Sequence, residues 1–258
     1  MRGDSGVTHS REVGSAPATI LYRERVESSN EELRLLARQG AAAGTVLWAG
    51  QQDAGRGRRG RRWISPPGNL YCSILLRPLC APMLAAQLGF VAALAVGDAL
   101  RPLLPEGTAL GLKWPNDVLI QGRKCAGILL ESETGADGLV AWVVAGIGIN
   151  IVSAPEAMEY PATSLKAQGC GEMAVSDVLE SLCAAFFARC RIWDEQGFEA
   201  IRAAWLEHAE HRFGEVRVQL GDTAMTGRFV DLDVDGALLL ETDEGSRRIA
   251  AGDVFPAG

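Results

Sequence analysis

Apolar positions along the chain follow two spacings, which together predict alternating strands and helices. Runs with the apolar density of strands occur at 45–52 and 70–77. The run at 83–100 repeats its apolar residues every three to four positions, as a buried helix does, and a second stripe of this kind covers 177–193. A further helix is predicted over 198–205. The order of elements is sheet, helix, more sheet, then helices that pack over the sheet.

A shorter helix is predicted near the start of this pattern. Ser28 and Ser29 are each followed three residues later by a glutamate, which is the pattern of a capping box, and Gly40 supplies a stop signal. We expect this helix over 30–39.

Three strands are predicted between the helical regions, with one tight hairpin. The first reads LGLKWPNDVLI (110–120), and the polar turn QGRK separates it from CAGILLES (125–132). The third, LVAWVVAGIGINI (139–151), is the most apolar strand of the chain.

The pattern changes near both ends of the chain. Past residue 212 four short alternating runs, separated by GD, DVDG and DEG turns, predict a small all-β barrel over 213–258. Residues 1–18 are polar and glycine-rich without apolar periodicity, so we expect a disordered leader there. The large α/β domain then covers 19–212, and its fold class is a mixed sheet with flanking helices.

Composition narrows the classes of function. With 258 residues, 48% of them hydrophobic, the chain can bury a large core, and its net charge of -7 disfavours a surface built for nucleic acid or anionic membrane. The run 83–100 contains Gln87, Gly89 and Asp98, which fits a core helix better than a membrane span. Six cysteines form no CxxC pair, so reduced thiols in the cytoplasm are expected, without a zinc site or a disulfide framework.

One basic island stands out in this acidic chain: residues 55–63 read GRGRRGRRW. A dinucleotide-binding GxGxxG would lead straight into a helix, whereas RRWISPPGN follows here. A nucleic-acid patch would be accompanied by further basic clusters, and a merely solvated turn would not need glycines between repelling charges. The pattern favours a loop that closes over an anion, with Arg56 and Arg58 at the ligand and Arg59, Arg61 and Arg62 keeping the empty loop solvated.

Two further motifs carry candidate chemistry. KWPND (113–117) fixes Lys113 in a proline-restricted turn, from which it can reach a carboxylate or a phosphate, while Asn116 and Asp117 also suit local backbone caps. GIGIN (146–150) ends an apolar strand with alternating glycines, which serve either tight packing or close approach of a nucleotide. The three histidines lie away from every motif, so a catalytic triad is not expected.

Taken in order, SSN, QQDAGRGRRGRRW, NLY, KWPND, KCAGILLE and GIGIN resemble the biotin protein ligases over about Glu24 to Phe255. The resemblance implies a catalytic domain of the class II aminoacyl-tRNA synthetase type, followed by a small SH3-like barrel. It also implies biotin and ATP as substrates with Mg²⁺, activation of biotin to biotinyl-5′-AMP, and transfer to a lysine of a biotin carboxyl carrier protein from acetyl-CoA carboxylase or a related carboxylase.

The same resemblance assigns roles to individual residues, with no metal ligand among them. Lys113 and Arg58 are the expected catalytic residues. The residues expected at biotin are Ser28, Ser29, Asn30, Gln52, Arg56, Gly57, Arg58 and Lys113. Those expected at ATP and the adenylate are Arg56, Arg58, Trp63, Asn116, Gly146, Gly148, and Asn150.

Three departures from the family pattern refine these expectations. Ser29 stands where these enzymes often carry threonine, which keeps the hydroxyl. About 23 residues precede the first motif, too few for a winged-helix domain, so a ligase without repressor activity is expected. We further expect a cytoplasmic protein, a monomer or homodimer, with neither nucleic acid nor membrane as a partner. Tyr160 is the one aromatic residue between Asn150 and Leu165, where relatives supply a tryptophan over adenine. Two alternatives remain: a lipoate or octanoate ligase of the same fold, and a non-enzymatic nucleic-acid-binding module.

Overall fold

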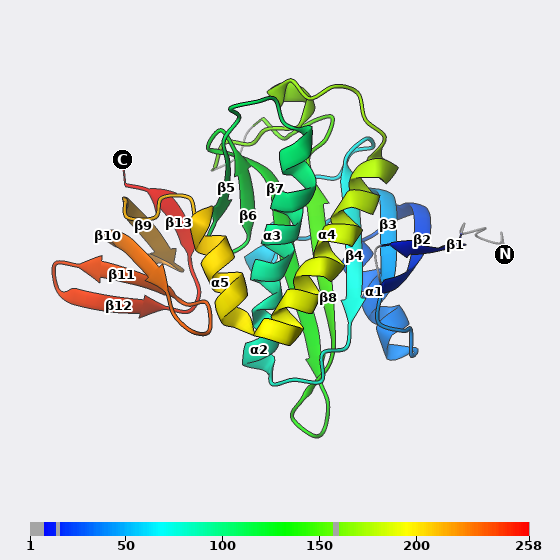
Figure 1. Cartoon of the computed structure of the whole chain (residues 1–258), viewed down its shortest axis with the longest axis horizontal. Coiled ribbons are helices and arrows are strands. Elements are labelled where there is room, and N and C mark those ends of the chain that lie inside the picture. The colour runs from blue at the N-terminus through cyan, green and yellow to red at the C-terminus, as the bar shows by residue number, and fades with distance from the viewer. Residues whose placement is uncertain (1–7, 14–15, 157–159, 258) are drawn as a thin grey trace.

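The structure, a computed structural model, describes residues 8–13, 16–156 and 160–257. It contains a large mixed sheet with helices on both faces and a smaller antiparallel sheet at the C-terminal end, which Figure 1 shows on the left. The helices are α1 Ser29–Arg38, α2 Pro82–Ala86, α3 Leu88–Leu100, α4 Val175–Gln196 and α5 Phe198–Glu207. The predicted fold class, a mixed α/β sheet followed by an antiparallel β unit, is confirmed.

The large sheet has eight strands in the order β1-β2-β3-β4-β8-β7-β6-β5. Only β2 and β3 run parallel among its neighbouring pairs, and the others are antiparallel. The strands are β1 Thr8–Val13, β2 Ala16–Val26, β3 Thr45–Gln52, β4 Leu70–Leu76, β5 Leu110–Lys113, β6 Asp117–Ile120, β7 Arg123–Thr134 and β8 Val140–Ile149.

Alternation along the central strands separates a core face from a site face. In β7, Ile128 packs into the main core together with α3 and α4, whereas Gly127 faces the opposite side of the sheet. Because side chains of a strand point to alternate faces, the glycines and short polar residues of β4, β7 and β8 gather on that opposite side. Helix α1 covers part of this side through Leu33 and Ala37, and its N-terminus borders the site.

The predicted helix at 83–100 is present, but it is divided after Ala86 into α2 and α3. The segment Pro82–Leu103 is long and apolar enough to span a membrane by length and composition. Nearly every residue of α3 is buried, and this helix packs on the sheet and against α4 (Figure 1). It is therefore the central core helix that its interspersed polar residues predicted.

Two predictions about strands are wrong in detail. LGLKWPNDVLI forms two strands, β5 and β6, because a turn at residues 114–116 reverses the chain and the two halves pair antiparallel. The last C-terminal run, RRIAAGDV, likewise contributes to two strands, so the second sheet has five strands in the order β12-β11-β10-β9-β13. Its strands are β9 Glu215–Leu220, β10 Thr223–Leu232, β11 Leu238–Thr242, β12 Gly245–Ile249 and β13 Asp253–Pro256.

The structure also differs from the predicted disordered leader. Residues 1–7 and 14–15 lie outside the described residues, but Thr8–Val13 forms strand β1 and pairs antiparallel with the start of β2. The physical reason is that β2 would otherwise present a row of unpaired backbone groups, which a polar segment can satisfy without any apolar pattern of its own.

The segment that leads from α5 to the second sheet is hydrogen-bonded to strand β5, and one further hydrogen bond reaches the second sheet's own turn. The N–H of Leu112 in β5 donates to the carbonyl of His208 at 2.7 Å, and the N–H of Glu210 donates to the carbonyl of Leu112 at 2.8 Å. Trp114 Nε1 donates to the carbonyl of Gly236 in the second sheet at 3.0 Å. These contacts fix the C-terminal unit beside the KWPND turn.

Candidate active site

One pocket collects almost every residue that the sequence singled out. It lies on the site face of the large sheet, between the N-terminus of α1, the arginine loop, the KWPND turn and strand β13. The predicted residues that line it are Ser28, Ser29, Asn30, Gln52, Arg56, Gly57, Arg58, Trp63, Lys113, Asn116, Gly146 and Gly148.

Asn150 is the predicted residue that does not line this pocket. It is 2% exposed, and its Nδ2 donates to the carbonyl of Thr163 at 3.1 Å. Its backbone also pairs with Cys125 and Leu165. Asn150 therefore fixes the segment after β8 from behind the site.

A polar network holds the start of α1. The backbone N–H of Ser29 donates to Gln52 Oε1 at 2.8 Å, and the buried Ser73 hydroxyl lies 2.8 Å from the Ser29 hydroxyl and 2.6 Å from Asn30 Oδ1. No side-chain cap bond forms at Ser28, so the expected capping box is wrong. The serines face the pocket, and the nearby glutamates pair with arginines instead.

The alternating glycines of β8 make room for side chains. A Cβ atom on Gly146 would lie 2.1 Å from Asn30 Oδ1, and one on Gly148 would lie 2.5 Å from the Trp63 ring. A Cβ on Gly127, which is paired with Gly148 across β7 and β8, would also meet this ring, at 2.9 Å. The Trp63 ring thus packs directly against the backbone of two paired glycines, Gly127 and Gly148. Of the two roles considered for GIGIN, the geometry favours tight packing of side chains against the strand.

Lys113 is the buried cation of the pocket. It is 5% exposed, lies 3.5 Å from Asp117 Oδ2, and its Nζ lies 4.3 Å from the centre of the Tyr160 ring. Burial lowers the pKa of Lys113 from its ordinary value of 10.5, and Asp117 opposes that change. Asp117 also binds Lys124 Nζ at 2.6 Å, so one carboxylate is shared by two cations. An anionic ligand near Lys113 would stabilise its charge.

Arg58 approaches the same region from the loop. Its guanidinium donates to Asn116 Oδ1 at 3.3 Å, and Asn116 Nδ2 donates to the carbonyl of Ile128 at 2.7 Å. Burial lowers the pKa of Arg58 as well. Two partly desolvated cations, Lys113 and Arg58, therefore flank the KWPND turn, where they can neutralise a carboxylate and a phosphate together.

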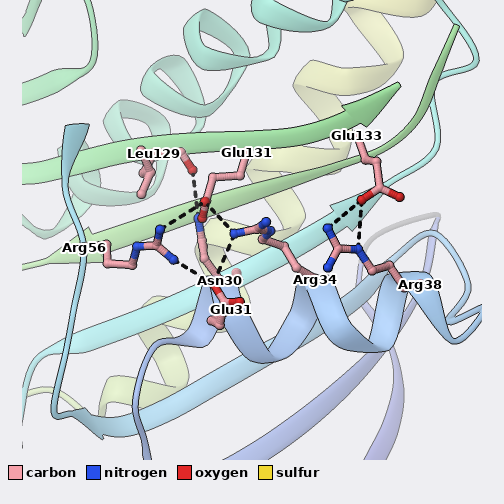
Figure 2. Close-up of polar contacts among 9 residues, drawn as sticks. Asn30, Glu31, Arg34, Arg38, Arg56, Leu129, Glu131 and Glu133 are labelled. Carbon is pink, nitrogen blue, oxygen red and sulfur yellow. Dashed lines mark hydrogen bonds and ion pairs between the residues drawn. The ribbon is translucent and has the colours of Figure 1, made fainter. Parts of the chain in front are cut away.

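The other loop arginines meet carboxylates of the chain itself. Figure 2 shows Arg56 pointing toward Glu31 of α1 and Glu131 of β7. Its guanidinium lies 2.7 Å from Glu31 and 3.9 Å from Glu131, and Arg34 links the same two glutamates. Glu131 also accepts from Asn30 Nδ2 at 2.9 Å, so this network connects the loop to the start of α1.

Arg59 and Arg61 bind Asp253 of strand β13, at 3.2 Å and 2.5 Å. Arg62 donates to the backbone carbonyl of Asp53 at 2.8 Å. The prediction that these three side chains only keep the empty loop solvated is therefore wrong, because each binds an acceptor within the chain.

Sequence reasoning missed the residues that the C-terminal sheet contributes. Asp253 and Phe255 line the pocket although they follow KWPND by more than a hundred residues, and Phe255 lies near Lys113 and Tyr160. Nothing in the local pattern of β13 marks them. Lys124 and Gly127 carried a weaker signal, a cation and a glycine within the strand run.

Two family models match the chain. The model described as the biotin/lipoate A/B protein ligase family covers residues 63–207, and the biotin protein ligase C terminal domain covers 213–255. Both matches fall on the units that the fold separates, the first on the large sheet with its helices and the second on the small sheet.

Named relatives agree with these matches. The chain is 40% identical over 240 residues to a biotin–[acetyl-CoA-carboxylase] ligase from Paracoccus denitrificans, covering 91% of this chain and 99% of that one. A bifunctional ligase/repressor BirA from Bacillus subtilis is 33% identical over 242 residues, with 91% of this chain and 73% of that protein covered.

Solved structures are similar over nearly the whole length. A biotin protein ligase from Aquifex aeolicus, in complex with biotin and ATP, has a TM-score of 0.77 at 30% identity and covers 92% of this chain and 97% of its own. With the motifs, the fold and the pocket in agreement, the chain belongs to the biotin protein ligase family.

Proposed function

We propose that this protein joins biotin to ATP, forming biotinyl-5′-AMP and pyrophosphate, and then transfers biotin to a lysine of a biotin carboxyl carrier protein. Support comes from one observation above all: Lys113 and Arg58 meet in a single pocket with the polar start of α1. The relative from Paracoccus denitrificans is named for ligation to acetyl-CoA carboxylase, and the Aquifex structure contains biotin and ATP.

The proposed roles at biotin follow from the chemistry of each end of the ligand. Biotin carries a ureido ring with N–H and C=O groups, which the hydroxyls and amides of Ser29, Asn30 and Gln52 can match. Its carboxylate would lie toward Lys113. Ser28 and Gly57 would border the ligand, and Arg56 would hold the loop beside it.

In the first half-reaction the biotin carboxylate attacks the α-phosphorus of ATP, and pyrophosphate leaves. Both reactants are anionic, so Lys113 and Arg58 would lower the barrier by neutralising charge as it builds between them. Asn116 orients Arg58 through its side-chain hydrogen bond. Trp63, which rests on Gly127 and Gly148, would form a wall of the nucleotide side.

The product is a mixed anhydride that water destroys, and the loop at 55–63 would protect it by covering the pocket. In the second half-reaction the acceptor lysine amine attacks the anhydride carbonyl, forming an amide and releasing AMP. The carrier protein must therefore reach the pocket while the loop still excludes water.

Mg²⁺ belongs to the proposal as a companion of ATP. Among the described residues no cluster of three or more His, Cys, Asp or Glu side chains could hold a metal ion. Asp117 and Asp253 are the carboxylates in the pocket lining, and both bind cationic side chains. Mg²⁺ would accordingly be held mainly by the ATP phosphates, as is common for this ion. We also propose a cytoplasmic location, where carrier, ATP and biotin meet.

The decisive test is mass spectrometry of a carrier domain after incubation with the protein, biotin and MgATP. The expected result is an added mass of one biotinyl group on a lysine. When lipoate or octanoate replaces biotin, we expect no lipoyl or octanoyl group on the carrier. Transfer of lipoate alone would support the alternative, a lipoate ligase of the same fold.

We further expect Lys113→Ala to abolish biotin-dependent pyrophosphate release, whereas Arg58→Gly retains some release but loses biotinyl-5′-AMP to solution.

Undiminished pyrophosphate release in Lys113→Ala would show that the assigned role of Lys113 is wrong. Salt-dependent DNA binding without any thermal shift from biotin plus ATP would instead favour a nucleic-acid-binding module.

A further inference from the structure

The arginine loop is bound to a carboxylate of the C-terminal sheet. Asp253 lies in strand β13, its side chain is 10% exposed, and it lines the same pocket as Lys113. Arg59 and Arg61, which precede it by 194 and 192 residues, both bind its Oδ2 atom. A part of the chain outside the large domain therefore contacts the loop at the pocket.

Two features indicate that this contact fixes the conformation of the loop. A carboxylate as buried as Asp253 must be neutralised. Lys113 and Arg58 are close enough to interact with its charge, but Arg59 and Arg61 bind it directly, and they can do so only when the loop crosses the pocket. Arg59 has φ 54° and ψ 35°, a left-handed conformation that a side chain other than glycine keeps only where its surroundings impose it. Two kinds of contact hold this turn: the backbone hydrogen bond from the N–H of Gly57 to the carbonyl of Arg61 at 2.7 Å, and the ion pairs of Arg59 and Arg61 with Asp253.

The carboxylate is separable from the sheet that carries it. Strand β13 pairs with β9 through its backbone, with Asp253 opposite Gln219, and Val254 and Phe255 are buried beside it. These interactions do not need a charge at position 253. Asp253→Asn keeps the shape of the side chain and removes the charge that binds the arginines.

We propose that Asp253 is a positioning residue, which holds the arginine loop over the pocket so that the C-terminal domain sets how long biotinyl-5′-AMP is retained. It acts through Arg59 and Arg61 and does not need to touch the reacting atoms. This inference rests on the proposed function, which supplies the intermediate to be retained.

The test is a single turnover with biotin and MgATP and without carrier, in which free and bound biotinyl-5′-AMP are separated over time. Asp253→Asn should release the adenylate at least about tenfold faster than the wild type, because it weakens two charge-assisted hydrogen bonds that hold the loop. Its formation should change much less. Asp253→Glu should restore slow release, because it returns the charge.

A matched control and a double variant isolate the contact. Glu241→Gln removes an exposed carboxylate of the same sheet, paired with Arg228, and should release the adenylate at the wild-type rate. Arg61→Ala changes an exposed loop residue and should mimic Asp253→Asn. The double variant should release no faster than the more severe single variant, because both remove one interaction.

Hydrogen exchange of the loop amides in the ligand-free protein provides a readout that needs no activity. We expect faster exchange at 55–63 in Asp253→Asn than in Glu241→Gln, with strands β9 to β13 equally protected in both. Wild-type release together with unchanged loop exchange would overturn the proposal. If the wild type forms no biotinyl-5′-AMP at all, the proposed function fails, and the exchange data still decide whether Asp253 holds the loop.

Discussion

At the scale of single residues, Lys113 shows how burial prepares a cation for an anionic substrate. Its ammonium has lost most of its water and gained one shared carboxylate and two aromatic rings. Aromatic faces stabilise a cation only modestly, and Asp117 divides its charge between Lys113 and Lys124. The net effect is a lowered pKa, so the protonated form is under-stabilised until an anion arrives.

The pH dependence of biotin activation should follow from this. The cation is present below the pKa of Lys113 and is lost as the pH rises through it, so activation should decline at a lower pH than 10.5, the ordinary value for lysine. Asp117→Asn removes a charge that raises this pKa, and the decline should move to still lower pH. Biotin-dependent pyrophosphate release measured across alkaline pH checks both, with Asp137→Asn as a remote control.

An alkaline limb that stays in place in Asp117→Asn would mean that another group controls it. The place of Lys113 in the pocket could be predicted from KWPND, because a proline-restricted turn limits where its side chain can go. Its aromatic surroundings could not, since Phe255 comes from another sheet.

At the scale of elements, the paired strands β7 and β8 form a smooth surface for one indole ring. Gly127 and Gly148 stand opposite each other in the ladder, and both lack the Cβ atom that would collide with Trp63. The glycine spacing in GIGIN was visible in the sequence, but the choice between packing and nucleotide contact was not. Trp63 precedes Gly148 by a long stretch of chain, and only the folded sheet brings the two together.

Gly148→Ala should therefore displace Trp63. Its Cβ would lie 2.5 Å from the ring, so we expect a loss of about 1–3 kcal/mol in the free energy of unfolding and impaired biotin activation. Urea denaturation and pyrophosphate release measure the two effects. Gly171→Ala is the matched control, because nothing lies within 4 Å of the added atom.

Trp63→Ala in the Gly148→Ala background should recover part of the lost stability, since the collision is gone. Equal losses in the single and double variants would show that the strand itself, and not the ring, resists the extra carbon. For helix α1 the sequence predicted the bounds to within a residue but not the contacts at its start. The capping box does not form, because the serines face the pocket.

At the scale of the whole molecule, a turn of the C-terminal sheet packs closely against a helix of the large domain. Gly236 lies in the turn before β11 with φ +87°, and a Cβ there would lie 2.4 Å from the ring of Phe90 in α3. The change in apolar spacing predicts a boundary near 212. The contacts across it could not be predicted, because ion pairs and turns that join distant segments leave no periodic pattern in the sequence.

Gly236→Ala should move the turn of the C-terminal sheet slightly away from helix α3. Gly221→Ala is its matched control: it also has positive φ, +67°, but nothing lies within 4 Å. Both variants lose about 1–2 kcal/mol for the left-handed backbone, and Gly236→Ala should lose about 1–3 kcal/mol more through the collision with Phe90. Thermal and urea unfolding measure the loss of stability in each variant. Equal losses would mean that Phe90 and the turn rearrange around the added carbon at little cost.

The backbone hydrogen bonds between Leu112 and the segment from His208 to Glu210 limit where the chain can be cut to obtain the large domain alone. Strand β5 is an edge strand of the large sheet, and the segment that connects α5 to β9 covers its outer edge. A fragment cut before His208 would expose that edge, with the donor and acceptor of Leu112 unpaired, as a template for aggregation. The end of the large domain, judged by its hydrogen bonds, therefore lies after Glu210, and the first residues of the connection belong to the sheet.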